Sequence, residues 1–144
     1  MNFEETSKIV SKCMQLFEPV PLPDDIERGE VGACFDTCAL LALKSKGKYE
    51  YCEGMVHIIH PGQTNEWLYH AWLTDKDHKY AYDPTWLAVD DYGVERAIPG
   101  LYKGVVLPIG LVAEFMKQSG YQGIFANKHR APDVYKKIEL AVTK

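Results

Sequence analysis

The sequence contains no apolar run that approaches the ~18 residues needed for a membrane-spanning helix. Its first residues, MNFEETSKIV, carry two glutamates and no basic cluster ahead of an apolar stretch, so a secretory signal peptide is not expected. Basic residues are in slight deficit, with 16 Lys and Arg against 20 Asp and Glu and a net charge of −4. We therefore expect a cytoplasmic protein with no membrane or nucleic-acid partner, although export by a signal-independent route stays open.

Cysteine is too scarce for a framework of disulfides, with four residues in a chain of 144. A domain of this length buries roughly 68–70% of the surface of its unfolded chain, so it needs no disulfide or metal to fold. We expect a single domain, spanning residues 1–144, in which the cysteines are reduced thiols. They are Cys13, Cys34, Cys38 and Cys52.

Two helices are expected in the first third of the chain. Apolar residues recur at helical spacing from residue 3 to residue 17, and the proline-rich segment 19–25 ends that pattern. A second helix is expected over residues 34–46, closed by Gly47. Because its central run, CALLAL, is apolar all round, we expect this helix to be buried on most sides.

After Gly47 the apolar pattern changes from helical spacing to alternation, which favours strands. Strands are expected at 49–59, 67–74, 79–83 and 103–107, with a loop at 61–65 and a tight turn at 75–78. Helical spacing returns at 109–118, followed by a loop at 127–133 and a short helix or strand at 135–142. Since strands that are neighbours in sequence are expected to pair, the fold class is α+β with a mainly antiparallel sheet.

Cys34 is expected at the first position of the second helix, where the environment favours a reactive thiolate. The aligned peptide dipoles of a helix stabilise an anion at its N-terminus, and the thiolate is the nucleophilic form of cysteine. The backbone N–H groups of the first helical turn have no partner within the helix. They can therefore stabilise the oxyanion that forms when a nucleophile attacks a carbonyl group.

His70 and Asp83 lie on the two strands that flank the expected turn at 75–78. If the turn is centred between Lys76 and Asp77, the numbers of facing residues add up to 153, which places His70 directly opposite Asp83. The Cβ atoms of such a pair lie about 4.5–5.5 Å apart, close enough for the carboxylate to orient the imidazole. A turn centred on Lys76 instead puts Asp83 on the other face, unless a bulge restores it.

Three short motifs in this order resemble those of the transglutaminase-like superfamily of papain-fold enzymes. They are Gly-Ala-Cys at 32–34, His-Ala-Trp at 70–72 and Asp-Pro-Thr at 83–85. The resemblance implies a papain-like core, in which a buried helix carrying the nucleophilic cysteine packs on an antiparallel sheet. It also implies that Cys34 is the nucleophile, His70 the general base and acid, and Asp83 the carboxylate that orients the histidine.

The resemblance covers residues 32–86, where it implies a catalytic core; the helix expected at 3–17 precedes this core, and residues 87–144 follow it as a C-terminal extension. It implies acyl transfer from an amide, either a peptide bond or a protein glutamine, through a Cys34 thioester to water or an amine. The partner is a protein or peptide substrate, and neither a cofactor nor a metal is implied. Trp72 and Trp86 are the candidate substrate-binding residues, because alternation places Trp72 on the same strand face as His70.

Other interpretations of these residues stay open. Cys38 follows Cys34 by one helical turn, but its apolar neighbours favour a core role. His70 alone is compatible with a buried core histidine, and Asp83 alone with a residue that starts a turn. A zinc site also stays open, although three residues rather than two separate the cysteines, and its ligands would be Cys34, Cys38, His57 and His60.

Two other function classes stay open as well. A non-catalytic interaction domain would keep the fold and bind a partner in the groove, and Cys34 would then react with thiol reagents no faster than Cys13 or Cys52. A different Cys-His-Asp enzyme, such as an arylamine acetyltransferase or an N-terminal amidase, would share the residue order. Acetyltransferases are usually much longer than 144 residues, which counts against that assignment.

Overall fold

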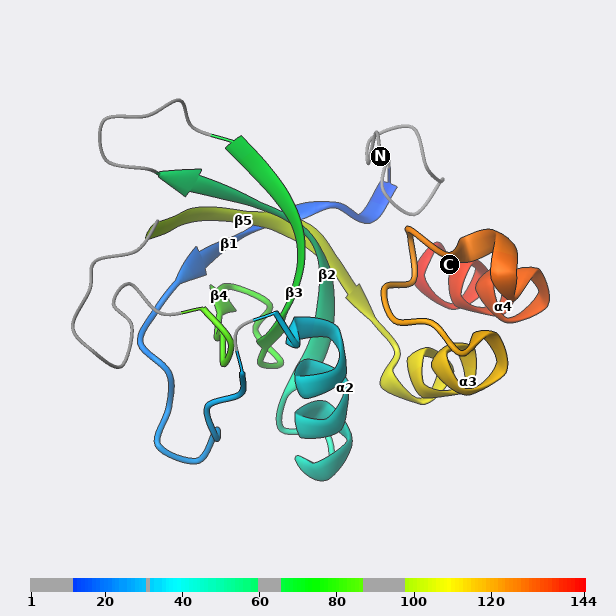
Figure 1. The fold of residues 1–144 in the computed structure, drawn as a ribbon, viewed down its shortest axis with the longest axis horizontal. Helices are drawn as coiled ribbons and strands as arrows, with labels where there is room; N and C mark the ends of the chain where they lie inside the picture. The colour runs from blue at the N-terminus through cyan, green and yellow to red at the C-terminus, as the bar shows by residue number, and fades with distance from the viewer. Residues whose placement is uncertain (1–11, 31, 60–65, 87–97) are drawn as a thin grey trace.

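The computed structural model describes residues 12–30, 32–59, 66–86 and 98–144, and it has the mixed α+β class expected (Figure 1). Its strands are β1 (Gln15–Pro19), β2 (Glu50–Ile59), β3 (Glu66–Thr74), β4 (Tyr80–Ala81) and β5 (Ile98–Leu107). Its helices are α2 (Cys34–Lys44), α3 (Ile109–Ser119), the short 3-10 helix η2 (Lys128–Arg130) and α4 (Pro132–Val142).

The strands form one sheet in the order β3-β2-β5-β1-β4. Pairing is antiparallel between β3 and β2, β2 and β5, and β5 and β1, so the expectation of a mainly antiparallel sheet is confirmed; β1 and β4 run parallel. An isolated bridge between Leu73 of β3 and Tyr82, next to β4, brings the two outer strands together. The sheet is therefore curled (Figure 1).

The position of β5 makes the segment after residue 97 integral to the sheet. The expected division places this segment in an extension beyond a core at 32–86, whereas β5 lies between β2 and β1 and pairs with both. After β5 the chain forms α3 and α4, which pack together beyond the end of that strand (Figure 1).

Alternation along the strands separates two clusters of buried side chains. One cluster lies on the sheet face that α2 and α3 cover, and it includes Cys38, Tyr51, Leu73, Val105 and Phe115. The other lies on the opposite face, inside the curl, and it includes Phe17, Cys52, Val56, Trp72 and Tyr102. His70 has the same parity on β3 as Trp72, so its side chain belongs to the inner face.

The predicted helix at 3–17 is wrong at its end, because residues 15–17 belong to strand β1. Phe17 is 1% exposed and packs edge-on against Trp72, with ring centroids 5.7 Å apart. These residues form a strand despite the helical spacing of their apolar side chains, because β5 and β4 pair with them. Both partners are distant in sequence, so the local spacing of apolar residues cannot predict the pairing. Residues 3–11 of the prediction lie outside the described part of the chain.

The second predicted helix is confirmed at its start, Cys34, and it ends two residues early, at Lys44. Lys46 and Gly47 have φ values of 53° and 90°, which turn the chain out of the helix. The expectation that this helix is buried on most sides is wrong, because Leu40 and Leu43 are 51% and 48% exposed. The sheet and α3 cover only part of its circumference.

The remaining element predictions differ mainly in their lengths. The strands at 49–59 and 67–74 are β2 and β3, while the strand at 79–83 shortens to β4 and the one at 103–107 is the end of the longer β5. The helix at 109–118 is α3, which ends at Gly120 with φ 74°. The predicted loop at 127–133 instead contains η2 and the start of α4. Residues 135–142, for which the sequence allowed a helix or a strand, belong to α4 and are helical. None of the helices described has the length and apolarity that crossing a bilayer requires.

Candidate active site

Cys34 occupies the first position of α2, with 7% of its surface exposed. The chain enters the helix through Gly32, whose φ of 91° favours glycine, and Ala33, whose N–H donates to the carbonyl of Glu30. Among the described residues no side chain caps α2. The N–H groups of its first turn therefore stay available to an anionic group next to the sulfur.

His70 connects Cys34 with Asp83. Its Nε2 lies 2.8 Å from Asp83 Oδ2, and the side chain of Cys34 is near enough to the ring to raise its pKa. Because Nε2 faces the carboxylate, Nδ1 is the ring nitrogen left for the thiol. His70 is 6% exposed, so water does not compete for these contacts.

The charge state of His70 follows from these two neighbours. Burial alone lowers the pKa of the imidazole, because it penalises the cation. The hydrogen bonds to Asp83 and Cys34, and the negative charges that these groups can carry, outweigh burial and raise the pKa of His70 from 6.5 to about 10. The protonated ring next to Cys34 is the arrangement that stabilises a thiolate.

Asp83 is fixed by hydrogen bonds to both of its carboxylate oxygens. Oδ1 accepts from the backbone N–H of Thr85 at 3.2 Å and from the Thr85 hydroxyl at 3.3 Å. Oδ2 accepts from His70 and from the hydroxyl of Tyr102. Its side chain is only 7% exposed, so these donors replace the water that an ionised carboxylate needs.

The predicted register between the strands of His70 and Asp83 is wrong by two residues, but the predicted contact is present. Leu73 and Tyr82 exchange both backbone hydrogen bonds, at 2.9 and 2.8 Å, so facing residue numbers add up to 155 rather than 153. Counted from this bridge, Asp83 faces Trp72 and lies diagonally from His70. A shift of two residues preserves the face of the strand, and diagonal neighbours stay within reach of long side chains.

The two candidate substrate-binding tryptophans lie in different environments. Trp86 is half-buried and meets His70 edge-on, with ring centroids 5.4 Å apart, so it lines the site. Trp72 is fully buried and packs edge-on against Phe17 and Tyr102. The structure therefore places Trp72 in the core behind the site rather than on its surface.

Sequence reasoning missed Tyr102, which donates to the catalytic candidate Asp83 from the centre of β5. No local pattern identifies it, because the contact depends on the pairing of β5 with β2 and β1. The core interpretation of Cys38 agrees with its complete burial. Burial raises the pKa of Cys38 and Cys52 well above the ordinary thiol value, so both are poor nucleophiles.

Glu53 is a second buried carboxylate that sequence reasoning missed. It is fully buried on β2, and it accepts hydrogen bonds from the hydroxyls of Tyr51 and Tyr69 and from the backbone N–H groups of Ile124 and Phe125. Burial raises the pKa of Glu53, while these donors act in the opposite direction.

Through Tyr69, this cluster reaches Phe35, the residue next to Cys34. The ring of Tyr69 packs against Phe35, with centroids 5.0 Å apart, and its hydroxyl accepts from the N–H of Phe125 at 3.1 Å. The segment after α3 is therefore held beside the start of α2.

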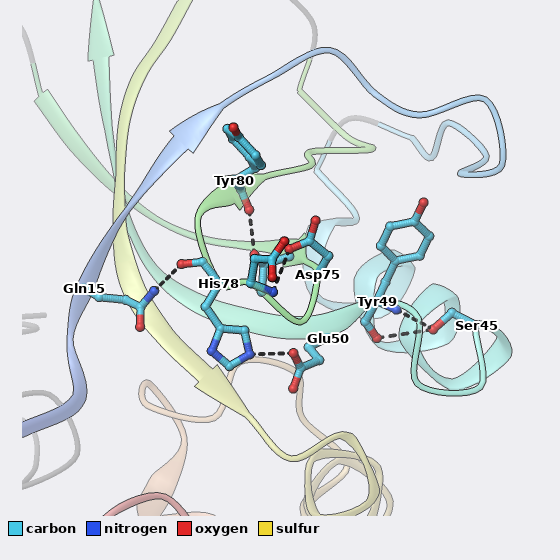
Figure 2. A network of polar contacts seen from close by, with 9 residues as sticks. Gln15, Ser45, Tyr49, Glu50, Asp75, His78 and Tyr80 are labelled. Atoms are coloured by element: carbon cyan, nitrogen blue, oxygen red, sulfur yellow. Dashed lines mark hydrogen bonds and ion pairs between the residues drawn. The ribbon is translucent and has the colours of Figure 1, made fainter.

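A further polar network holds the turn that leads to Asp83 (Figure 2). His78, in the turn between β3 and β4, has φ 53°, its carbonyl accepts from Gln15 Nε2 at 2.6 Å, and its Nε2 lies 2.5 Å from Glu50 Oε2. The hydroxyl of Thr74 donates to the carbonyl of Tyr80 at 2.7 Å. These contacts fix β4 and so the approach of the chain to Asp83.

The zinc alternative finds no support in the described part of the chain, where no group of three His, Cys, Asp or Glu side chains could hold a metal ion. Of its four residues, Cys34 lies near His70, Cys38 is buried in the core, and the ring of His57 lies tilted against that of Trp67 with centroids 5.0 Å apart. His60 lies outside the described residues.

Comparisons with protein-family models, curated proteins and solved structures found no match to this chain. What the site can do therefore follows from the geometry and chemistry of its own residues. That geometry is a thiol at a helix start, a buried imidazole in contact with it, and a fully hydrogen-bonded carboxylate behind the imidazole. The same three groups in this arrangement generate and orient a nucleophile in hydrolases and acyltransferases of several folds.

Proposed function

We propose that this protein is a thiol-dependent acyl-transfer enzyme that acts on an amide, either a peptide bond or a protein glutamine. The observation that carries the proposal is the chain of contacts from Cys34 through His70 to Asp83, buried at the N-terminus of α2. Three residues far apart in sequence converge in the order that nucleophile, base and orienting carboxylate require. The enzyme would release the acyl group to water, as in hydrolysis or deamidation, or transfer it to an amine.

In the first half-reaction, the thiolate of Cys34 attacks the carbonyl carbon of the amide and forms a carbon–sulfur bond. The carbonyl oxygen takes up the negative charge, and the N–H groups of the first turn of α2 stabilise it. When this intermediate collapses, the carbon–nitrogen bond breaks and His70 gives its proton to the leaving amine or ammonia. The product is a thioester on Cys34.

In the second half-reaction, water or an amine attacks the thioester. The attacking group gives a proton to His70, the carbon–sulfur bond breaks, and Cys34 leaves as a thiolate paired with the protonated ring. Asp83 transfers no proton in either half. It holds the ring so that one nitrogen faces the sulfur, and its charge stabilises the imidazolium.

We further propose that the curled sheet and α2 form a papain-like or transglutaminase-like core. Support comes from a cysteine at the start of a helix packed on the sheet, a histidine on one strand and an aspartate two residues after the end of another. The substrate would be a protein or peptide, with Trp86 as one wall beside His70. A cytoplasmic location is part of the same proposal.

The test is intact-mass spectrometry of the protein after exposure to candidate glutamine-containing proteins and peptides. We expect a covalent acyl adduct that hydroxylamine removes, present in the wild type and in Cys38→Ala and absent in Cys34→Ala. Cys38→Ala is the matched control because it removes a thiol one helical turn away that lies in the core. An adduct that persists in Cys34→Ala, or full biological activity of Cys34→Ala, would contradict the proposed function.

A further inference from the structure

Tyr102 is a buried tyrosine whose hydroxyl ends at the candidate active site. It is 1% exposed, and the hydroxyl donates to Asp83 Oδ2, the same oxygen that faces His70 Nε2. Its ring centroid lies 6.4 Å from that of His70. Two donors therefore share one carboxylate oxygen: a neutral hydroxyl and an imidazole that carries a proton during catalysis.

The packing around Tyr102 leaves its hydroxyl little freedom. On β5 it pairs with Phe17 of β1 on one side and Val56 of β2 on the other. Its ring meets that of Trp72 edge-on, with centroids 5.0 Å apart. Gly104, two residues along β5, leaves the space that the Trp72 ring fills, since a Cβ there would lie 2.5 Å from Trp72 Cη2. The core thus aims the hydroxyl at Asp83.

We propose that Tyr102 is a positioning residue that acts through Asp83, sharing the charge of the carboxylate so that His70 can release its proton during acyl transfer. The inference rests on the proposed function of the site. A carboxylate whose only other partners are the two Thr85 donors would hold the imidazolium more strongly. A histidine that donates a proton to a leaving amine works best when it does not hold that proton too tightly.

The direction of the effect follows from hydrogen bonding to the charged form. Tyr102→Phe removes one donor from Asp83 Oδ2 and leaves that oxygen to His70 alone. With one donor fewer, the negative charge on this oxygen attracts the His70 proton more strongly. The pKa of His70 should therefore rise above its value in the wild type. The charge of Cys38 also reaches Asp83 and Tyr102, and burial raises the pKa of this thiol well above its ordinary value, which disfavours a thiolate there.

Tyr51 supplies a matched control. Its hydroxyl donates at 2.6 Å to the other buried carboxylate, that of Glu53, and it is as deeply buried as Tyr102. Tyr51→Phe therefore deletes the same atom from the same kind of contact on the opposite face of the sheet. A merely structural role for Tyr102 would make the two variants behave alike.

The experiment is an NMR titration of the full-length chain with labelled histidine, from neutral to alkaline pH. The His70 signal is assigned by its absence in His70→Ala. We expect Tyr102→Phe to raise the midpoint of His70 by about half a pH unit or more and Tyr51→Phe to leave it unchanged. An unchanged or lower midpoint in Tyr102→Phe, or an equal rise in Tyr51→Phe, would overturn the inference.

A second variant keeps the test decisive if Tyr102→Phe does not fold. Thr85→Val removes the hydroxyl that donates to the other oxygen of Asp83, so we expect a smaller rise in the same direction, and no rise would count against the inference. The titration needs no substrate and no turnover. It therefore gives its answer even if no acyl adduct forms on Cys34, which keeps the failure of this inference distinguishable from the failure of the proposed function.

Discussion

The backbone N–H of Gly29 donates to the carbonyl oxygen of Pro84 at 2.9 Å, joining the segment before Cys34 to the segment that carries Asp83. A side chain at Gly29 would collide with α2, because a Cβ there would lie 2.5 Å from Thr37 Cγ2. The segments that flank Cys34 and Asp83 are thus joined by a backbone hydrogen bond, in addition to the contact of Asp83 with His70.

Cys34 is expected to be the fastest-reacting thiol of the chain. It lies at a helix N-terminus and beside His70, whose pKa is raised, whereas burial raises the pKa of Cys38 and Cys52 and makes them poorer nucleophiles. We expect iodoacetamide at neutral pH to label Cys34 at least about tenfold faster than the other cysteines, and this advantage to shrink in His70→Ala. Peptide mapping by mass spectrometry measures the rates. Equal rates at Cys34 and Cys13 would favour the interaction domain.

Substitutions in the three-residue site are expected to differ in severity. Cys34→Ala should abolish turnover, and His70→Ala should be nearly as damaging because the two residues act as a unit. Asp83→Ala should keep roughly ten- to a hundredfold more activity than His70→Ala, since Asp83 orients the ring and transfers no proton. Single-turnover assays on an accepted substrate compare the three. An Asp83 variant as impaired as His70→Ala would contradict the roles assigned here.

The stability of the protein should depend on pH through His70. Its folded-state pKa of about 10 lies above the ordinary 6.5, so the native state binds the proton more tightly than the unfolded chain. The stabilisation that this difference supplies is fully present below the ordinary pKa of 6.5, and it is lost as the pH rises through the folded-state pKa of about 10. We expect the free energy of unfolding, measured by urea titration, to fall more steeply over that window in the wild type than in His70→Gln. Parallel curves would show that His70 is not stabilised as a cation.

Gly104→Ala is expected to destabilise the protein by about 1–3 kcal/mol, because overpacking a filled core forces side chains or backbone to move. A Cβ at Gly104 would lie 2.4 Å from the Glu53 carbonyl oxygen and 2.5 Å from Trp72 Cη2. Gly110 in α3 is the matched control, since a Cβ there meets nothing within 4 Å. Gly110→Ala should be neutral or stabilising by up to ~1 kcal/mol. Equal urea midpoints for the two variants would contradict the close packing.

Glu53→Gln is expected to cost about 1–3 kcal/mol, because an amide nitrogen replaces an oxygen that accepts from buried donors. Ile124 N–H lies 2.9 Å from both carboxylate oxygens, so either orientation of the amide sets a donor against a donor. Glu50→Gln is the control: Glu50 pairs with His78 at the surface, where such pairs contribute about 0–1 kcal/mol. Thermal and urea unfolding compare the variants, and similar losses would refute a special role for Glu53.

The parts of the site that local patterns encode were predictable from the sequence. The start of α2 at Cys34 follows from the glycine before it and the apolar residues after it. The shared face of His70 and Asp83 follows from the two-residue period of strands, which survives the error in register. A period of two fixes the face of a strand but not the position of its partner.

The parts that depend on distant partners were not predictable in this way. The spacing of apolar residues at 15–17 fits a helix, yet these residues form β1 because β5 and β4 pair with them. Tyr102 and Glu53 look like ordinary strand residues until the sheet order places their side chains against Asp83 and Ile124. The alternation pattern that located Trp72 correctly on a face could not tell a core position from a surface one.

The central place of β5 also governs the order in which the chain can fold. β3 and β2 can pair as soon as residue 74 is present, but β1 has no antiparallel neighbour until β5 arrives, more than eighty residues later in the chain. Closing so long a loop is slow, because its entropy is lost before the contacts form. Tyr102 reaches Asp83 only at that stage. The nascent chain would thus carry Cys34, His70 and Asp83 well before the Tyr102 hydroxyl can fix the Asp83 oxygen that faces His70.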